Sequence, residues 1–153
     1  MYEPTKYKYS LKFSIGTLAL MLLMMFILLN NVMATNNTVA WIIFGAFSAF
    51  FISLFSLLIA KRLIPAIKGN IALELTDSTM IDYIRNITVD WKDIKDIEFV
   101  RGRSASTLQV NLKWESDYGS RIAIPLRWVK GKDEEIYDTV MAYFENCGET
   151  TNQ

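Results

Sequence analysis

One group of acids in this chain has a spacing that could serve catalysis. Asp90, Asp93 and Asp96 recur at steps of three residues. Carboxylates that converge in a pocket can act as a general acid and a general base. Lysines are interleaved with these acids, and the segment crosses from one predicted strand into the next, so we expect a solvated turn. The chain has no histidine, which excludes histidine-based triads and zinc sites that use histidine.

A second group of residues has the chemistry to hold an anion or a partner. Arg101 and Arg103 flank a glycine and precede two serines, and arginine pairs well with phosphate. Trp128 lies between Arg127 and Lys130, where an exposed indole beside bases can contact a partner or a membrane. Arg101, Arg103 and Trp128 are therefore the predicted contacts. The alternatives are an ordinary solvated loop for the arginines and packing under a helix for the tryptophan.

The single cysteine, Cys147, cannot form an internal disulfide, which fits a reducing cytoplasm. It falls on the apolar face of a predicted helix, where a cysteine is usually a small core residue and not a nucleophile. The sequence thus predicts no catalytic residue, no metal ligand and no cofactor, and an enzyme is the least expected class.

The elements that must position these residues begin with a long uncharged segment. Phe13 to Ala60 holds 48 residues without Asp, Glu, Lys or Arg, and a polar break at Asn30–Thr38 divides it. A membrane-spanning helix needs about 20 apolar residues. These runs lack the alternation of a barrel strand, so we expect two transmembrane helices, 13–33 and 39–60, joined by the polar loop 30–38.

Basic residues flank this predicted hairpin on both sides, and its loop carries no charge. Lysines precede the first span and further bases follow the second, namely Lys6, Lys8, Lys12, Lys61, Arg62 and Lys68. Cytoplasmic flanks carry such an excess of bases, so both termini are expected in the cytoplasm. The rival for the first span is a signal peptide cleaved after Val32-Met33-Ala34, although its apolar region is longer than usual.

Small residues recur at steps of three and four along the second span and predict a ridge on one helix face. They are Gly45, Ala49, Ser53, Ser56 and Ala60. Such ridges let helices approach closely in lipid. The ridge is interpreted as packing within the hairpin, with a homodimer seam as the alternative. No ionisable residue lies inside either span, which makes a pump or a proton-coupled transporter unexpected.

After the hairpin, the hydrophobic pattern changes from a helical period to a period of two residues, which is typical of strands. Residues 69–153 hold ten Lys or Arg and fifteen Asp or Glu, a balance of −5 that argues against nucleic acid as a partner. Leu108, Val110, Leu112 and Trp114 form the cleanest alternation, so Trp114, like Trp91, is expected to point inward. Many short strands at roughly ten-residue spacing predict an antiparallel sandwich or partly open barrel. Pro125 suits an edge strand.

An amphipathic helix is predicted from Asp133, with acids in its first turn and a stop at Gly148. Its apolar face would close the open end of the sheets. The expected organisation is an N-terminal segment, a hairpin, a connector, a β domain and a tail, at 1–12, 13–60, 61–70, 71–148 and 149–153.

Six short strands followed by one helix resemble a pleckstrin-homology-like (PH-like) domain. Trp91, Asp93-Ile94 and Ile97 are similar to a pattern in bacterial PH-like domains, an aromatic residue followed by an acid-Ile pair and a further Ile. The whole layout resembles small bacterial inner-membrane proteins with two N-terminal spans and one PH-like domain. The resemblance implies seven strands, one more than the pattern supplies, and implies the bacterial inner membrane as the location.

The sequence and the resemblance together favour a non-enzymatic, membrane-tethered adaptor that binds a protein partner, either as a monomer or as a homodimer. One alternative is a sensor of lipid or of the state of the envelope, which would read headgroups through Arg101, Arg103 and Trp128. Another is an immunity protein whose hairpin neutralises a membrane-active toxin. The acidic balance counts against the lipid sensor.

Overall fold

A computed structural model describes residues 3–35, 37–103 and 106–148, so the tail predicted at 149–153 lies outside the described residues. The chain divides into two compact units. One is Leu11–Lys68. The other combines Met1–Ser10 with Gly69–Gln153, so it is assembled from both sides of the first unit in the sequence.

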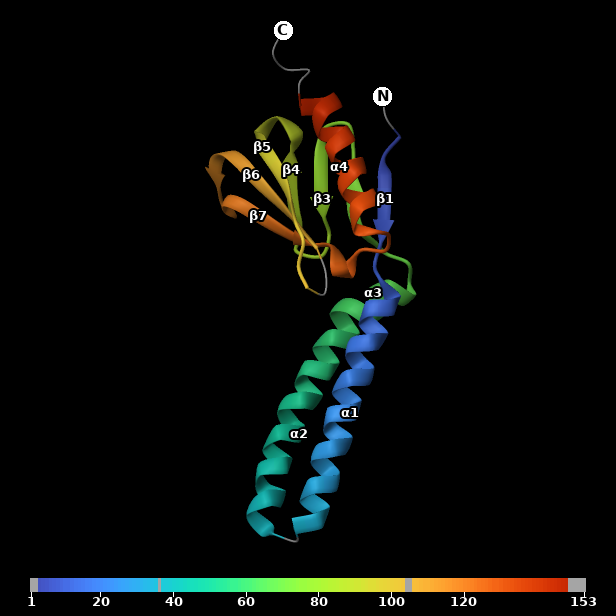
Figure 1. The fold of residues 1–153 in the computed structure, drawn as a ribbon, viewed down its shortest axis with the longest axis vertical. Helices are drawn as coiled ribbons and strands as arrows, with labels where there is room; N and C mark the ends of the chain where they lie inside the picture. Colours follow the sequence, from blue (N-terminus) through green and yellow to red (C-terminus); the bar gives the residue numbers. More distant parts are fainter. Residues whose placement is uncertain (1–2, 36, 104–105, 149–153) are drawn as a thin grey trace. The chain divides into compact units, whose positions relative to one another are not determined.

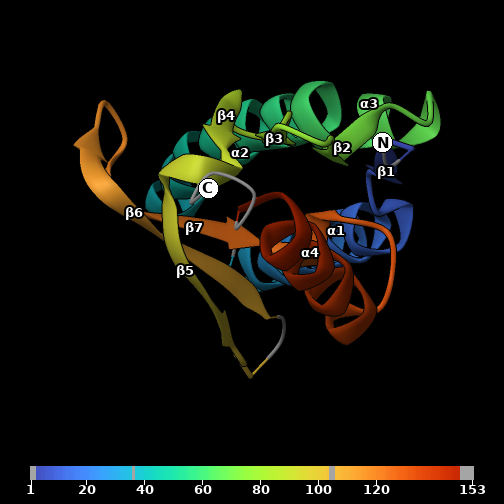
Figure 2. The ribbon, with the colours of Figure 1, turned by 90° about the horizontal axis from the view of Figure 1, so that it is seen from above.

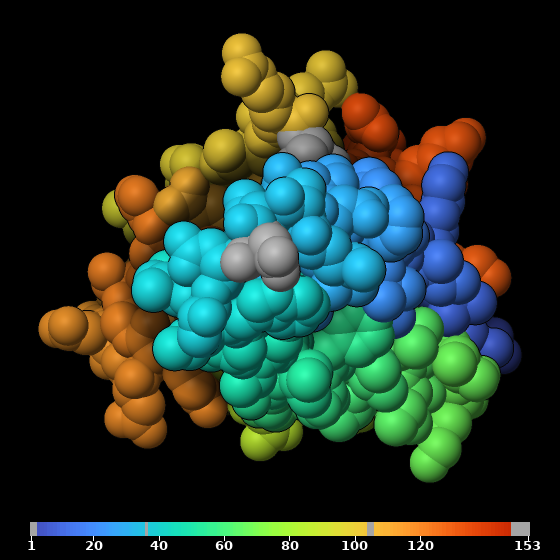
Figure 3. Space-filling model, turned by 90° about the horizontal axis from the view of Figure 1, so that it is seen from below, coloured from blue at the N-terminus to red at the C-terminus, as the bar shows by residue number. Residues whose placement is uncertain are grey.

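The helical unit is a hairpin of α1 (Leu11–Thr35) and α2 (Thr38–Leu58). By length and composition, α1 and the continuous helix Thr38–Ile67 are apolar enough to cross a membrane, and almost none of either is buried. The two helices contact each other along their length. Figure 3 looks onto the loop end of the hairpin. Leu28 and Val32 of α1 line one hollow with Phe44 and Phe47 of α2.

The polar break is much shorter than the loop predicted at 30–38, because most of it is helical. The Asn31 side chain donates to the Ile27 carbonyl at 2.9 Å, and the Thr35 hydroxyl donates to the Val32 carbonyl at 3.0 Å. Asn37 then begins the next helix, since its side chain accepts from the Val39 N–H at 2.9 Å. Polar side chains that bond to their own backbone therefore extend both predicted spans.

Most of the predicted small-residue ridge has no close neighbour in the hairpin, although Ser56 lines one hollow with Leu22 and Met25 of α1. Gly45, Ala49, Ser53, Ser56 and Ala60 are all exposed. A Cβ added at Gly45 would meet nothing within 4 Å. Phenylalanines of α2 face α1 in place of the ridge, because large rings fill the space between two helices that small residues would leave open.

The second helix also continues through the predicted connector at 61–70. A π-helical turn, η1 (Ile59–Leu63), leads into the short α3 (Ile64–Ile67). Pro65 lies in the first turn of α3, and proline removes one N–H and crowds the carbonyl four residues earlier. The wider turn absorbs that irregularity, so the helix continues past Pro65 to Ile67.

The β unit contains two antiparallel sheets. The first has the order β1-β2-β3-β4, with β1 (Thr5–Lys8), β2 (Ile71–Leu75), β3 (Thr79–Asp82) and β4 (Ile87–Asp90). The second has the order β5-β6-β7, with β5 (Ile94–Val100), β6 (Thr107–Ser116) and β7 (Gly119–Pro125). A short 3-10 turn, η2 (Trp91–Asp93), carries the chain from one sheet to the other.

The first strand comes from the N-terminal segment, which corrects the predicted domain limits of 1–12 and 71–148. Thr5, Lys6 and Tyr7 lie opposite Leu75, Glu74 and Leu73 in an antiparallel pair. The Tyr9 N–H then donates to the Asn70 carbonyl at 3.2 Å, and the Ser10 N–H to the Trp128 carbonyl at 2.7 Å. The described residues of the β unit therefore form seven strands, and the helical hairpin is inserted between the first and the second.

The C-terminal helix α4 (Asp133–Gly148) packs against both sheets, as Figures 1 and 2 show. Ile136 and Val140 are fully buried. The Tyr137 ring lies 5.1 Å from that of Phe99 in β5. On the other side the Tyr143 hydroxyl donates to the Glu3 carbonyl and shares a hydrogen bond of 2.9 Å with Thr5. The prediction of a terminal helix that closes the sheets is confirmed.

Trp91 forms the centre of the core. Its side chain is 1% exposed, its indole N–H donates to the Thr76 carbonyl at 2.8 Å, and its ring stacks on Tyr143 at 6.0 Å. A buried indole normally needs such an acceptor. The inward position predicted for Trp91 is confirmed.

Candidate functional site

In the predicted anion loop, much of the positive charge is offset by a neighbouring acid. The Arg101 guanidinium lies 3.2 Å from the Glu134 carboxylate at the start of α4, and it also covers the Phe99 ring at 5.8 Å. Arg103 is exposed beside residues 104–105, which lie outside the described residues. An anion would have to compete with Glu134 for Arg101, so this loop is a weak phosphate site.

Trp128 belongs to the short turn η3 (Leu126–Trp128) between β7 and α4 and is half-buried. The Arg127 guanidinium lies over its ring at 5.9 Å. Its carbonyl accepts the Ser10 N–H, which joins the N-terminal segment to the domain. The backbone of Trp128 therefore helps to hold the N-terminal segment, and its half-buried ring is covered on one side by Arg127.

The three aspartates of the acidic segment are separated by the fold. Asp90 ends β4 and Asp93 ends η2, and both line one groove, whereas Asp96 belongs to β5 and does not. One carboxylate oxygen of Asp96 is buried and accepts no hydrogen bond from any residue that the structure describes. Asp90 and Asp93 thus lie at either side of a short, partly exposed turn, as expected, and that turn also borders a groove.

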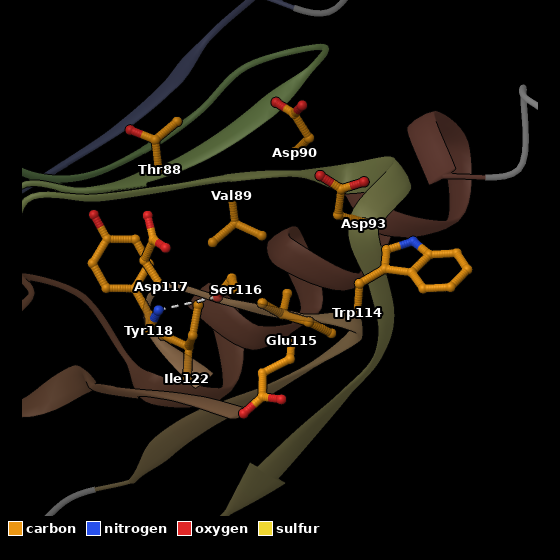
Figure 4. A pocket seen from close by; sticks show the side chains of 11 residues that line it. Thr88, Val89, Asp90, Asp93, Trp114, Glu115, Ser116, Asp117, Tyr118 and Ile122 are labelled. Carbon is orange, nitrogen blue, oxygen red and sulfur yellow. Dashed lines mark hydrogen bonds between the residues drawn. The ribbon is translucent and has the colours of Figure 1, made fainter. Parts of the chain in front are cut away.

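The groove has a volume of about 370 Å³ and lies between β4 and the outer end of the β6–β7 hairpin (Figure 4). Val89 and Ile122 are buried in it, and Leu112 is half-buried. These apolar side chains form its floor. The other lining residues are polar or aromatic: Thr88, Asp90, Asp93, Trp114, Glu115, Ser116, Asp117 and Tyr118.

Two of the most exposed aromatic residues in the β unit lie in this groove. Trp114 is 74% exposed and Tyr118 is 53% exposed. Trp114 was expected to point into the core, and the pairing of β6 explains why it does not. The first residue of β5, Ile94, lies opposite Leu112, so β6 runs beyond the end of β5 at Trp114. In the part of the chain that the structure describes, the Trp114 side chain therefore stays largely exposed to solvent.

The tip of the hairpin is held in shape by its own turn. The Ser116 hydroxyl donates to the Gly119 carbonyl at 2.9 Å and accepts the Tyr118 N–H at 3.2 Å. Gly119 has φ +84°, a conformation that favours glycine. These bonds fix the backbone of the turn that carries Asp117 and Tyr118 on the rim of the groove.

Acids dominate the charge of the groove. Asp90, Asp93, Glu115 and Asp117 line it, and none of the lining residues is Lys or Arg. Asp90 is neutralised in part by Lys92 at 3.2 Å. Within the described chain, Asp93, Glu115 and Asp117 form no ion pair. The groove therefore presents an acidic, partly aromatic surface that favours cations and repels phosphate.

The described residues include no group of His, Cys, Asp or Glu that could hold a metal ion. Cys147 is partly buried on α4; burial raises the pKa of its thiol, and the nearby Asp77 charge raises it further. A raised pKa keeps the thiol protonated and poorly nucleophilic at neutral pH. This fits the packing role predicted for Cys147.

Sequence reasoning singled out Asp90 and Asp93, but it missed Glu115, Asp117 and the groove itself. The signal that could have revealed it is the segment Trp114-Glu115-Ser116-Asp117-Tyr118, where two aromatic residues and two acids surround a turn. Comparison of the chain with protein-family models, with curated proteins and with solved structures found no match.

Proposed function

We propose that this protein is a non-enzymatic, membrane-anchored interaction module that binds a protein segment at the cytoplasmic face of a bacterial inner membrane. The observation that carries the proposal is the ordered groove with Trp114 and Tyr118 exposed on its rim. Exposed tryptophan and tyrosine are enriched in the centres of protein interfaces, where burying them supplies much of the binding energy.

The strand pairing supports a two-span topology. β1 ends three residues before α1, and β2 begins four residues after α3, yet the two strands pair in one sheet. The polypeptide must therefore leave that sheet and return to it on the same side of a membrane, which requires an even number of crossings. Removal of a signal peptide after Ala34 would also remove β1 from its sheet, so the hairpin is favoured over the cleaved alternative.

The distribution of charge supports the cytoplasmic side. The helical unit has no acid, and its four bases, Lys12, Lys61, Arg62 and Lys68, all lie at the ends nearest the β unit in the sequence. Bases next to a span favour the cytoplasmic side. We therefore assign both termini, and the β unit between them, to the cytoplasm.

The architecture of the β unit supports a PH-like domain. It has seven antiparallel strands in sheets of four and three, followed by one helix that closes the assembly. The strand missing from the sequence pattern is supplied by β1. The functional part of the proposal does not rest on this likeness, because one fold serves many functions; it rests on the groove.

The two alternatives have less support. A sensor of anionic headgroups would need free bases, whereas Arg101 is paired with Glu134 and the groove is acidic. An immunity protein that captures a toxin in the membrane would use the outward face of the hairpin, and the exposed ridge at Gly45 and Ala49 is compatible with that reading. Neither alternative explains the aromatic rim of the groove.

Site-specific cross-linking in native membranes tests the proposal. A photoreactive amino acid replaces Trp114 in the full chain, and the control carries it at Asp138, which is exposed on α4. The expected result is a discrete protein adduct from position 114 and none from position 138. Adducts of equal yield from both positions, or only lipid adducts from position 114, would refute a partner site in the groove.

Reporter fusions test the topology. An enzyme that is active only in the cytoplasm is fused before Met1 or after Gln153, and both fusions are expected to be active. The same enzyme inserted between Asn36 and Asn37, the junction of the two helices, is expected to be inactive. Activity at the junction together with inactivity at either terminus would reverse the assigned orientation.

A further inference from the structure

We propose that the groove recognises a short, extended peptide segment in which arginine or lysine alternates with apolar residues. This inference rests on the proposed function and names the chemical class of the partner. It follows from three properties of the groove that are independent of one another: its charge, its aromatic rim and its position at the edge of a sheet.

The charge of the groove selects a cationic occupant. Asp93, Glu115 and Asp117 have no ion-pair partner within the described chain, and Asp90 shares only one exposed lysine. The Lys113 ammonium donates to the Lys92 carbonyl at 2.7 Å and is not among the residues that line the groove. Three unpaired carboxylates on a concave surface attract bases and repel acidic segments, nucleic acid and anionic lipid.

The aromatic residues make arginine an especially suitable ligand. Figure 4 shows Trp114 with Asp93 at one end of the groove and Tyr118 with Asp117 at the other, with Val89 between them. Each end thus combines a ring with a carboxylate. A guanidinium can stack on the ring and pair with the acid at the same time, which a neutral side chain cannot do.

The position of the groove favours an extended backbone. β4 is the last strand of its sheet, and it pairs only with β3 among the described strands. Across the groove, Lys113–Glu115 of β6 runs beyond the end of β5 and lies in an irregular stretch of its pairing with β7. An extended peptide can add to such an edge through main-chain hydrogen bonds.

The apolar floor accounts for the alternation. Successive side chains of an extended segment point to opposite sides. If one apolar residue of the segment points toward Val89 and Ile122, the residues before and after it point the other way. Their basic side chains can then reach the rim. A volume of about 370 Å³ holds only a few side chains, so the recognised segment is short. We assign it to another protein, because Lys12, Lys61 and Arg62 of the helical unit lie in helix and not in an extended segment.

The test uses the full chain in nanodiscs of zwitterionic phosphatidylcholine, so that no anionic lipid competes. The probe is a fluorescent octapeptide of alternating Arg and Val. Two control peptides have citrulline or Glu in place of Arg, which removes or reverses the charge while the length is kept. Binding is measured by fluorescence anisotropy at low and high salt.

Variants of the groove are compared with matched variants elsewhere. Trp114→Ala and the pair Asp93→Asn with Asp117→Asn remove a ring and two charges from the groove. Tyr83→Ala and the pair Asp138→Asn with Glu145→Gln make the same kinds of change at exposed positions outside it. Near-ultraviolet circular dichroism establishes that each variant is folded before its affinity is measured.

The Arg-Val peptide is expected to bind, and each groove variant is expected to raise its Kd about tenfold, with the outside variants unchanged. Equal binding of the citrulline peptide, or equal affinity of the groove and outside variants, would overturn the inference. A partner cross-linked at position 114 combined with no binding of the Arg-Val peptide would leave the proposed function standing and refute only the basic-segment class. Absence of both results would refute both proposals.

Discussion

Glu74 connects three parts of the first sheet through its carboxylate. It accepts the Tyr83 O–H at 2.8 Å and lies 3.2 Å from the Lys6 ammonium of β1. The hydrogen bond from Tyr83 is the largest cause of the lowered pKa of Glu74, and the Lys6 ammonium lowers this pKa further. Burial acts in the opposite direction and raises the pKa. A depressed pKa in the folded state means that the charged form contributes stability above the unfolded pKa. That contribution is lost as the pH falls through the folded pKa.

The first prediction is that Tyr83→Phe raises the pKa of Glu74, because the ring remains while the donor is removed. The measurement is a titration of the Glu74 carboxyl carbon by NMR in the full chain. The acid-dependent loss of stability should also shift to higher pH, since the folded pKa moves toward the unfolded one. Asp138→Asn serves as the control, since that acid lies on exposed α4. An unchanged Glu74 titration would mean that the Tyr83 bond does not persist in solution.

Single residues also show where sequence reasoning reached its limit. Trp91 and Trp114 both occupy inward positions of an alternating pattern, and only Trp91 is buried. Alternation fixes which side of a strand a residue lies on, but it does not say where the opposing layer ends. Trp114 lies beyond the start of β5, so the same pattern that predicts a core residue there produces an exposed rim. The groove depends on this offset between strands, which no local pattern encodes.

Helices and strands with a strong hydrophobic period were predicted well from the sequence. The strand β1, which has no such period, was not predicted. The strands β2 to β7 and the helix α4 follow from their alternation or their apolar face. β1 is only four residues, Thr-Lys-Tyr-Lys, and its lysines resemble the basic flank of a span more than a strand. Its pairing with β2 joins residues that are far apart in the sequence, and only the folded chain reveals it.

The second prediction concerns the contact between α4 and the sheets. Ile136 is fully buried, so Ile136→Asp would place an unpaired charge in the core and is expected to unfold the β unit. Ala142→Asp introduces the same group on the exposed face of α4 and is expected to have little effect. Near-ultraviolet circular dichroism of each full-length variant in a mild detergent measures whether its β unit is folded. Equal signals from both variants would show that α4 is not packed as described.

The third prediction concerns the ridge of α2. Because a Cβ at Gly45 would meet nothing within 4 Å, Gly45→Leu is expected to leave the hairpin intact. Phe51 lines the space between α1 and α2, so Phe51→Ala should weaken the hairpin instead. Limited proteolysis in detergent measures the resistance of each variant to cleavage, and the two values are compared. A loss of resistance in Gly45→Leu would restore the ridge as a contact within the hairpin, and a change only in oligomeric state would show that it lies between copies.

At the scale of the whole molecule, the hairpin is an insertion into one domain and not an appendage in front of it. Lys8 lies opposite Ile71, and Tyr9 and Asn70 are joined by a hydrogen bond, so the two points where the chain leaves the domain are neighbours. The two chain segments that join the helical unit to the domain therefore start from neighbouring strands, β1 and β2.

The fourth prediction follows from that insertion. Replacing Leu11–Lys68 by a Gly/Ser linker of about four residues is expected to give a soluble, folded domain, because each linker residue spans at most about 3.3–3.6 Å and the ends are adjacent. Residues 69–153 alone lack β1 and with it the buried Tyr9, which is 8% exposed in the whole unit. That fragment should be less stable by about 2 kcal/mol or more in urea unfolding. Equal stability of the two proteins would mean that β1 is dispensable, and the two-span topology would lose its strongest support.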